Sequence, residues 1–212
     1  MATSFLVLDI ATAPLPNAAE FLSDQDFAAP ANYKDPEKIA AYLADKKAQA
    51  IAECALDPDL CRLSGMAFRD SDDVQVGIAH HLPKSYEADW ISQIGDVLRN
   101  GARLISYNGL KFDWAVLNAR ARYLGVKFDI SLDRYKTSHI DLYAKLTNHG
   151  QLKGHSLGWW VRRHGWTDLE KPLDGAEESK VFETGRWAEL AASLRHDVEA
   201  TRRLAIWMGI LE

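Results

Sequence analysis

The sequence predicts an α/β domain in which helices flank a mixed central sheet. Two observations indicate this class: strand-like segments come early and two of them form a hairpin pattern, and short strands then alternate with amphipathic helices. The chain has 212 residues and is 47% hydrophobic, which suits a single domain with a sizeable core and excludes a disordered chain. We therefore expect one domain over residues 1–212, with a peripheral helical insertion at about residues 15–60.

The first elements are one strand and the insertion. Residues 5–8 are apolar and precede Asp9, which predicts a buried strand that ends at this aspartate. Residues 36–55 have a helical pattern, with Asp35 placed to cap the helix and a proline at its first position. The apolar stripe of this helix is thin, so we expect it to be peripheral.

The middle of the chain supplies the hairpin and two further elements. Residues 61–68 and 74–80 have the pattern of strands joined by a polar turn. Residues 86–99 form an amphipathic helix that ends at an asparagine–glycine pair. Residues 103–107 then predict another short strand.

The C-terminal half continues the alternation. Apolar residues at helical spacing predict a helix that Gly125 closes. We expect a strand at residues 138–143 and a helix at residues 156–164. Residues 168–178 are polar and contain proline and glycine, which predicts a loop before a long final helix at residues 187–208.

Charge is distributed unevenly along the chain. The formal net charge is −5, yet residues 118–165 carry nine Lys/Arg against three Asp/Glu, a net of +6. Aromatic residues interleave with these cations, as on surfaces that follow a nucleic-acid backbone and stack bases. The alternative, which composition alone favours, is that the arginines solvate helix faces and the aromatics fill the core.

The remaining composition bears on the cellular setting. Cys54 and Cys61 are too few for a disulfide framework, so we expect a reducing, cytoplasmic environment. No apolar run approaches the roughly 20 residues of a membrane helix, and the N-terminus lacks the pattern of a signal peptide. We therefore expect no membrane partner.

Three aspartates occupy positions that suit chemistry. Asp9 follows the first strand, Asp113 opens a helix after a strand and turn, and Asp197 falls within the apolar stripe of the last helix. An ionised carboxylate on such a stripe is costly unless it is paired or binds a metal. Taken singly, each has a structural alternative: a turn cap, a helix N-terminus or an ion pair with arginine. Taken together, they favour a shared Mg²⁺ or Mn²⁺ site.

Three segments resemble the motifs of the DEDD 3′–5′ exonucleases, the DnaQ-like branch of the ribonuclease H-like fold. Residues 5–14 resemble the first motif, residues 107–113 the second with its N-G-x-x-F-D pattern, and residues 194–201 the third. Residues 32–39 with 55–59 resemble the insertion of predicted exonucleases that are similar to the proofreading domain of family B DNA polymerases. The resemblance implies a ribonuclease H-like mixed central sheet flanked by helices.

The resemblance also implies a function, which is 3′–5′ exonuclease action on single-stranded nucleic-acid ends by two-metal phosphodiester hydrolysis. Asp9, Asp113 and Asp197 match three of the four acids, so we expect them to be catalytic and to bind Mg²⁺ or Mn²⁺. Asn108 and Phe112 are expected to shape the substrate pocket. Four arginines of the basic segment are candidates for contact with the nucleic-acid backbone: Arg120, Arg122, Arg162 and Arg163.

Two positions depart from the family pattern. The first motif should read Asp-x-Glu, but Ala11 takes the place of the glutamate, and Ser193 takes the place of the tyrosine that orients water. These losses should weaken metal binding and catalysis. An engineered change would explain Ala11 but not Ser193, so natural divergence is the favoured reason.

Three hypotheses therefore stay open. The chain is an exonuclease of attenuated activity, a catalytically inactive nucleic-acid-binding module on the same fold, or an interaction domain that has lost both roles. In the first two, the partner is single-stranded DNA or RNA, with a polymerase or repair protein as a further expected partner.

Overall fold

The central sheet is mixed and has its longest strand in the middle. The computed structural model describes residues 5–23, 27–70, 73–81, 85–128, 139–171, 173 and 175–212. Within these residues the strand order is β3-β2-β1-β4-β5, with β2 antiparallel to both β1 and β3, and with β4 parallel to both β1 and β5. The strands are β1 (Phe5–Pro14), β2 (Cys61–Arg69), β3 (Gln75–Ile78), β4 (Arg103–Ser106) and β5 (Ile140–Asp141). The predicted class, a mixed sheet with flanking helices, is confirmed.

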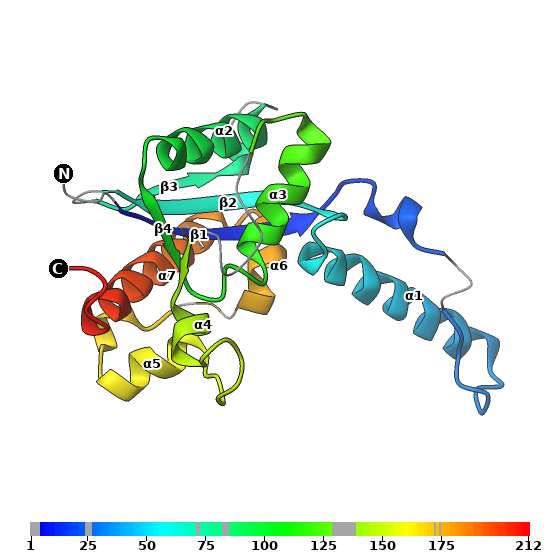
Figure 1. The fold of residues 1–212 in the computed structure, drawn as a ribbon. Coiled ribbons are helices and arrows are strands. Elements are labelled where there is room, and N and C mark those ends of the chain that lie inside the picture. The colour runs from blue at the N-terminus through cyan, green and yellow to red at the C-terminus, as the bar shows by residue number, and fades with distance from the viewer. Residues whose placement is uncertain are drawn as a thin grey trace.

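Helices cover both faces of this sheet. Figure 1 shows α2 and α3 on one face and α7, α6, α4 and α5 on the other. Their bounds are α1 (Pro36–Glu53), α2 (Tyr86–Arg99), α3 (Asp113–Leu124), α4 (Leu142–Leu146), α5 (Leu157–His164), α6 (Glu178–Glu183) and α7 (Trp187–Trp207). The sheet therefore has a separate hydrophobic core on each side.

The side-chain alternation of β1 divides its residues between the two cores. Leu8 and Ile10 belong to the core under α2 and α3, whereas Val7 and Ala11 belong to the core under α6 and α7. Because side chains alternate along a strand, Asp9 shares the side of Val7 and Ala11. A polar residue is thus placed on a packed face, next to two helices.

Helix α1, unlike most of the helices that cover the sheet, adds no buried residue to either core. None of its described residues is buried, and Figure 1 shows it extending away from the sheet. The side chain of Asp35 accepts a 3.0 Å hydrogen bond from the backbone N–H of Glu37, which confirms the predicted cap. The prediction of a peripheral helix is also confirmed.

Several predicted bounds are wrong. β1 continues through Asp9 to Pro14, because its residues on both sides of this aspartate pair with β2 and one polar residue does not end the strand. The strand expected at residues 138–143 is reduced to Ile140–Asp141, since Asp141 caps the start of α4; Ser138 lies outside the described residues. The loop expected at residues 168–178 ends in α6, which begins at Glu178.

Among the described residues, no helix is both long enough and apolar enough to cross a membrane.

Candidate active site

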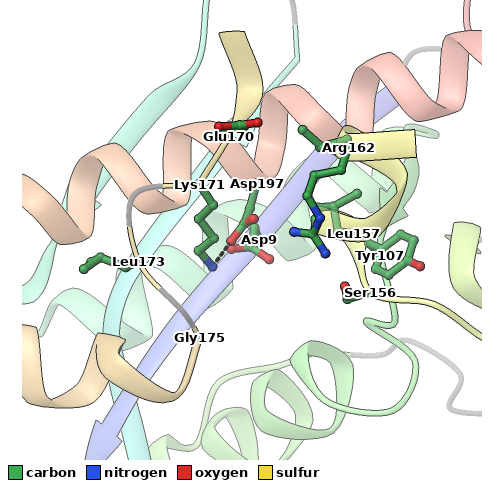
Figure 2. A pocket seen from close by; sticks show the side chains of 12 residues that line it. Asp9, Tyr107, Ser156, Leu157, Arg162, Glu170, Lys171, Leu173, Gly175 and Asp197 are labelled. Carbon is green, nitrogen blue, oxygen red and sulfur yellow. Dashed lines mark hydrogen bonds and ion pairs between the residues drawn. The ribbon is translucent and has the colours of Figure 1, made fainter. Parts of the chain in front are cut away.

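A lysine reaches the carboxylates on the α6 and α7 side of β1. The Nζ atom of Lys171 donates to a carboxylate oxygen of Asp197 on α7, and it lies 2.8 Å from Oε1 of Glu178 at the start of α6. Figure 2 shows the ammonium group beside Asp9 as well. Lys171 thus links α6 to α7, which pack on the same face of β1.

Glu178 is held by a second donor. The hydroxyl of Ser193 donates to the same Oε1 atom at 3.0 Å, and Ser193 is 0% exposed. A fully buried hydroxyl that is bonded to Glu178 is not placed to orient a water molecule for attack on a phosphodiester. The structure therefore agrees with the expectation that position 193 lacks the tyrosine's role.

The second motif forms a tight turn between β4 and α3. Asn108 has a φ of 63°, and a Cβ atom on Gly109 would lie 2.1 Å from the hydroxyl of Ser106, so this turn requires glycine. The carboxylate of Asp141 accepts hydrogen bonds from the backbone N–H groups of Asn108 at 2.9 Å and Leu110 at 3.0 Å. The end of β5 therefore fixes the turn that delivers Asp113 to the site.

Asp113 is tied to the central strand by its side chain. Its Oδ1 atom accepts a 3.3 Å hydrogen bond from the backbone N–H of Ile10, and the residue is 7% exposed. Ile10 directly follows Asp9, so the two motifs meet at one point of β1. The arrangement brings together the three aspartates that the sequence singled out.

The carboxylates share one electrostatic environment. Burial raises the pKa of Asp113 to about 7 and that of Asp197 to about 6, although Lys171 opposes the second shift. Burial, followed by the negative charges of Asp197 and Asp113, raises the pKa of Asp9 well above its usual range. Burial alone would lower the pKa of Lys171, but the carboxylates of Asp197, Glu178 and Asp9 outweigh it and raise that pKa. The lysine is therefore a stable cation among these acids.

Two adjoining cavities open over this cluster. Their volumes are about 510 and 640 Å³, and Asp9, Tyr107, Lys171 and Asp197 line both. Six of the residues predicted from sequence line one or both cavities: Asp9, Asn108, Phe112, Asp113, Arg162 and Asp197. The two cavities thus share a lining of acids, a lysine and a tyrosine.

The four predicted arginines separate into two groups. Arg162 on α5 lines the 510 Å³ cavity, and Figure 2 shows its guanidinium pointing into that space. Arg120 instead binds Glu87 through two hydrogen bonds of 3.0 and 2.8 Å in the buried core, so its contact with a phosphate would require breaking that pair. Arg122 and Arg163 are exposed but do not line either cavity as the structure describes them.

Sequence reasoning missed three residues of the site. Tyr107 was within the second motif without an assigned role, whereas Lys171 and Glu178 lay in a segment predicted to be a loop. The hydroxyl of Tyr107 donates to the backbone carbonyl of His155, and its ring meets that of Tyr143 edge to face at 5.8 Å between centroids. The only signal for Lys171 and Glu178 was their position just before the helix of the third motif.

The residues as arranged do not fit a two-metal centre. Within the described part of the chain, no three acidic, histidine or cysteine side chains are grouped so that they could hold a metal ion. The ammonium of Lys171 lies against Asp197 and Glu178, and the position of the missing acid is Ala11, which is 1% exposed. A divalent ion would have to displace the lysine to reach these oxygens.

Comparison with known proteins agrees with the fold. A family model described as the RNase H superfamily matches residues 53–208. The structure is also similar to that of the family B DNA polymerase from the hyperthermophilic archaeon Pyrobaculum calidifontis, with a TM-score of 0.62 and 16% sequence identity. The match covers 98% of this chain and 25% of the polymerase, so the chain spans about a quarter of that protein's length. No curated protein matches the sequence.

Proposed function

Because the chain belongs to the RNase H superfamily, we propose that it binds the end of a single-stranded nucleic acid in the two cavities around Asp9, without two-metal hydrolysis. The observation that carries this proposal is the lining of the 510 Å³ cavity. It combines Arg162, which is a cation for phosphate, with the ring of Tyr107, on which a base can stack. Of the acids that an exonuclease would use for its metals, Asp197 is bonded to Lys171, which also binds Glu178.

Two features support a single strand as the ligand. The cavities are about 510 and 640 Å³, which suits one or a few nucleotides rather than a duplex. Stacking on an aromatic ring requires an unpaired base whose face is free. The resemblance of the three motifs to the DEDD exonucleases supports an end rather than an internal segment.

The test is binding of a 5′-labelled single-stranded oligonucleotide, measured by fluorescence anisotropy in EDTA. We expect Arg162→Met to weaken binding by about tenfold, since an arginine–phosphate contact is a charge-assisted hydrogen bond. Arg163→Met is the matched control, because Arg163 is the next residue on α5 and does not line either cavity in the described structure. Equal losses for both variants, or no binding by the unmodified chain, would contradict the proposal.

A second candidate function is a metal-dependent 3′–5′ exonuclease. It is favoured by one observation: Glu178 lines the 640 Å³ cavity together with Asp9, Asp113 and Asp197, so a further acid lies with the three that match the motifs despite Ala11. Degradation of a 5′-labelled strand with Mg²⁺ or Mn²⁺ tests it, comparing the unmodified chain with Asp113→Ala, Ala11→Glu and Ala11→Glu/Ser193→Tyr. Cleavage by the unmodified chain that is lost in Asp113→Ala would establish the exonuclease and overturn the binding-only function.

We further propose a cytoplasmic protein whose ligand is single-stranded DNA or RNA and which works with a polymerase or repair protein. Support for the location comes from the two free cysteines, and support for the partners comes from the fold.

A further inference from the structure

We propose that the ammonium group of Lys171 is a built-in cation that takes the place of a divalent metal among the carboxylates of Asp9, Asp197 and Glu178. The inference deepens the proposed function and rests on it for the ligand, because the same site would then bind nucleic acid without a metal. It begins from the disagreement between the implied two-metal centre and the residues that are present.

The first argument is position. Nζ of Lys171 contacts Asp197 and lies 2.8 Å from Glu178, so one cation already bridges oxygens from α7 and α6. Asp9 on β1 interacts with the same positive charge. A metal ion bound by these acids would occupy the volume that the ammonium fills (Figure 2).

The second argument is the way in which the partners of Lys171 are fixed. Glu178 accepts from both Lys171 and the buried hydroxyl of Ser193 at the same oxygen, Oε1. Position 193 is where the family pattern has a tyrosine, so the residue that would serve hydrolysis instead orients the partner of the lysine. The departure at position 193 is then part of the arrangement that holds the lysine.

The third argument is that Lys171 is held from both sides along the chain. Leu169 packs in a small core with Val161 and Ala200, and Leu173 packs in the core under α6 and α7. Both leucines are buried, at 8% and 7% exposure. Leu169 and Leu173 are thus anchored two residues before and two residues after Lys171. Packing as well as charge therefore directs the lysine side chain at the acids.

The test is Mn²⁺ binding to the full chain after treatment with EDTA, measured by isothermal titration calorimetry and by the shift in thermal unfolding midpoint. Lys171→Met removes the charge while retaining most of the side-chain volume. We expect the unmodified chain to bind Mn²⁺ weakly, with no shift in midpoint, and Lys171→Met to bind it at least about tenfold more tightly and to be stabilised by it. Lys180→Met is the matched control, since Lys180 is exposed on α6, and it should behave like the unmodified chain.

Lys171→Arg retains a cation and should also behave like the unmodified chain. If Lys171→Met unfolds in EDTA, Mn²⁺ should restore its circular dichroism spectrum, and failure to do so would overturn the proposal. Stoichiometric Mn²⁺ binding by the unmodified chain, no weaker than by Lys171→Met, would also overturn it, because the metal would then displace the lysine. Failure of the proposed function gives a different result: no oligonucleotide binds with or without Mn²⁺, whatever the metal affinities are.

Discussion

At the scale of single residues, Asp113 is a carboxylate whose buried position favours its protonated form. Its pKa is raised to about 7 by burial, above the value of 3.8 for an exposed aspartate. The folded state therefore holds the proton more tightly, and the stability that this contributes is present at low pH and lost as pH rises through about 7. Unfolding in urea without metal should show Asp113→Asn gaining stability relative to the unmodified chain by about 1.4 kcal/mol per pH unit from pH 5 to about pH 7, with little further change up to pH 8.

The control for this prediction is Asp45→Asn, because Asp45 is exposed on α1. It should track the unmodified chain at both pH values. A difference between Asp113→Asn and the unmodified chain that stays constant with pH would show that the carboxylate does not titrate on folding.

Two arginines on α3, Arg120 and Arg122, should differ in how much they contribute to the stability of the fold. Arg120 and Glu87 form a pair whose side chains are 8% and 10% exposed, and Glu87 also accepts a 2.8 Å hydrogen bond from the backbone N–H of Leu63. Arg120→Met should destabilise the fold by about 3 kcal/mol, since it leaves a buried carboxylate without its cation. Chemical unfolding measures the loss, and Arg122→Met, an exposed change on the same helix, should stay within about 0.5 kcal/mol.

The sequence predicted some of these residues' roles and not others. The aspartates were identifiable because each sits in a motif with fixed spacing, and the structure places all three at one site. The roles of Arg120 and Lys171 were not identifiable, since each depends on a partner far along the chain, Glu87 in one case and Asp197 in the other. Tertiary pairing leaves no local pattern.

At the scale of elements, α1 depends on local interactions more than the other long helices. It has 18 residues, none of them buried, and its first turn is capped by Asp35. Asp35→Ala should therefore speed amide hydrogen exchange along α1. The free energy of local opening should fall by roughly 1 kcal/mol, the cost of a lost cap, while the global unfolding midpoint stays the same. Ser156→Ala at the cap of α5 is a useful contrast, because α5 packs on α7 and the change should lower the global midpoint.

A fall in the global midpoint for Asp35→Ala would indicate that α1 is part of the main cooperative unit. An unchanged exchange rate in α1 would indicate that the cap is not what holds its first turn.

The accuracy of the predicted helices followed their length. Long periodic segments such as α2 and α7 were predicted nearly to their ends, because an apolar stripe repeats several times in each. Helix α6 was missed because six residues span fewer than two turns, and its start at Glu178 depends on contacts with β1 and α7. Short elements next to a site are formed by what they pack against.

At the scale of the whole molecule, net charge describes this protein poorly. The total is −5, yet the segment 118–165 carries +6, and Arg162 of that segment lines a cavity that Asp9 and Asp197 also line. Binding of single-stranded oligonucleotide should therefore weaken as salt increases despite the negative total. Each phosphate contact contributes a slope of about 0.7 in log K against log salt, so Arg162→Met should lower the slope by about that amount.

Binding that does not change with salt would show that contacts with bases, rather than with phosphates, dominate. The same slope in Arg162→Met and the unmodified chain would remove Arg162 from the phosphate contacts.

The alternative for the basic segment is confirmed in part. Phe128 fills the core at 8% exposure, whereas Tyr123 is 62% exposed and its hydroxyl donates to Asp59. Residues 129–138, which include Tyr135, lie outside the described residues. The mixed central sheet could be expected from the resemblance, but composition could not assign these aromatics, because it does not distinguish a core ring from a surface ring.

Ala11 lies beside the site, at the point where the pairing of β1 with β2 shifts register. Its replacement has a consequence for the order in which mutations could restore a cleaving site. A glutamate restored at position 11 would enter a packed face and add an anion to Asp9, Asp197 and Glu178, with Lys171 already engaged. Removal of Lys171 alone would leave those acids without their cation. Without a metal, each single step should therefore lower stability, and both changes together should lower it further, because an added anion and a lost cation both raise the negative charge of the cluster. Only a divalent cation bound in place of the ammonium would offset that charge, so the present site and a cleaving one are separated by more than one substitution.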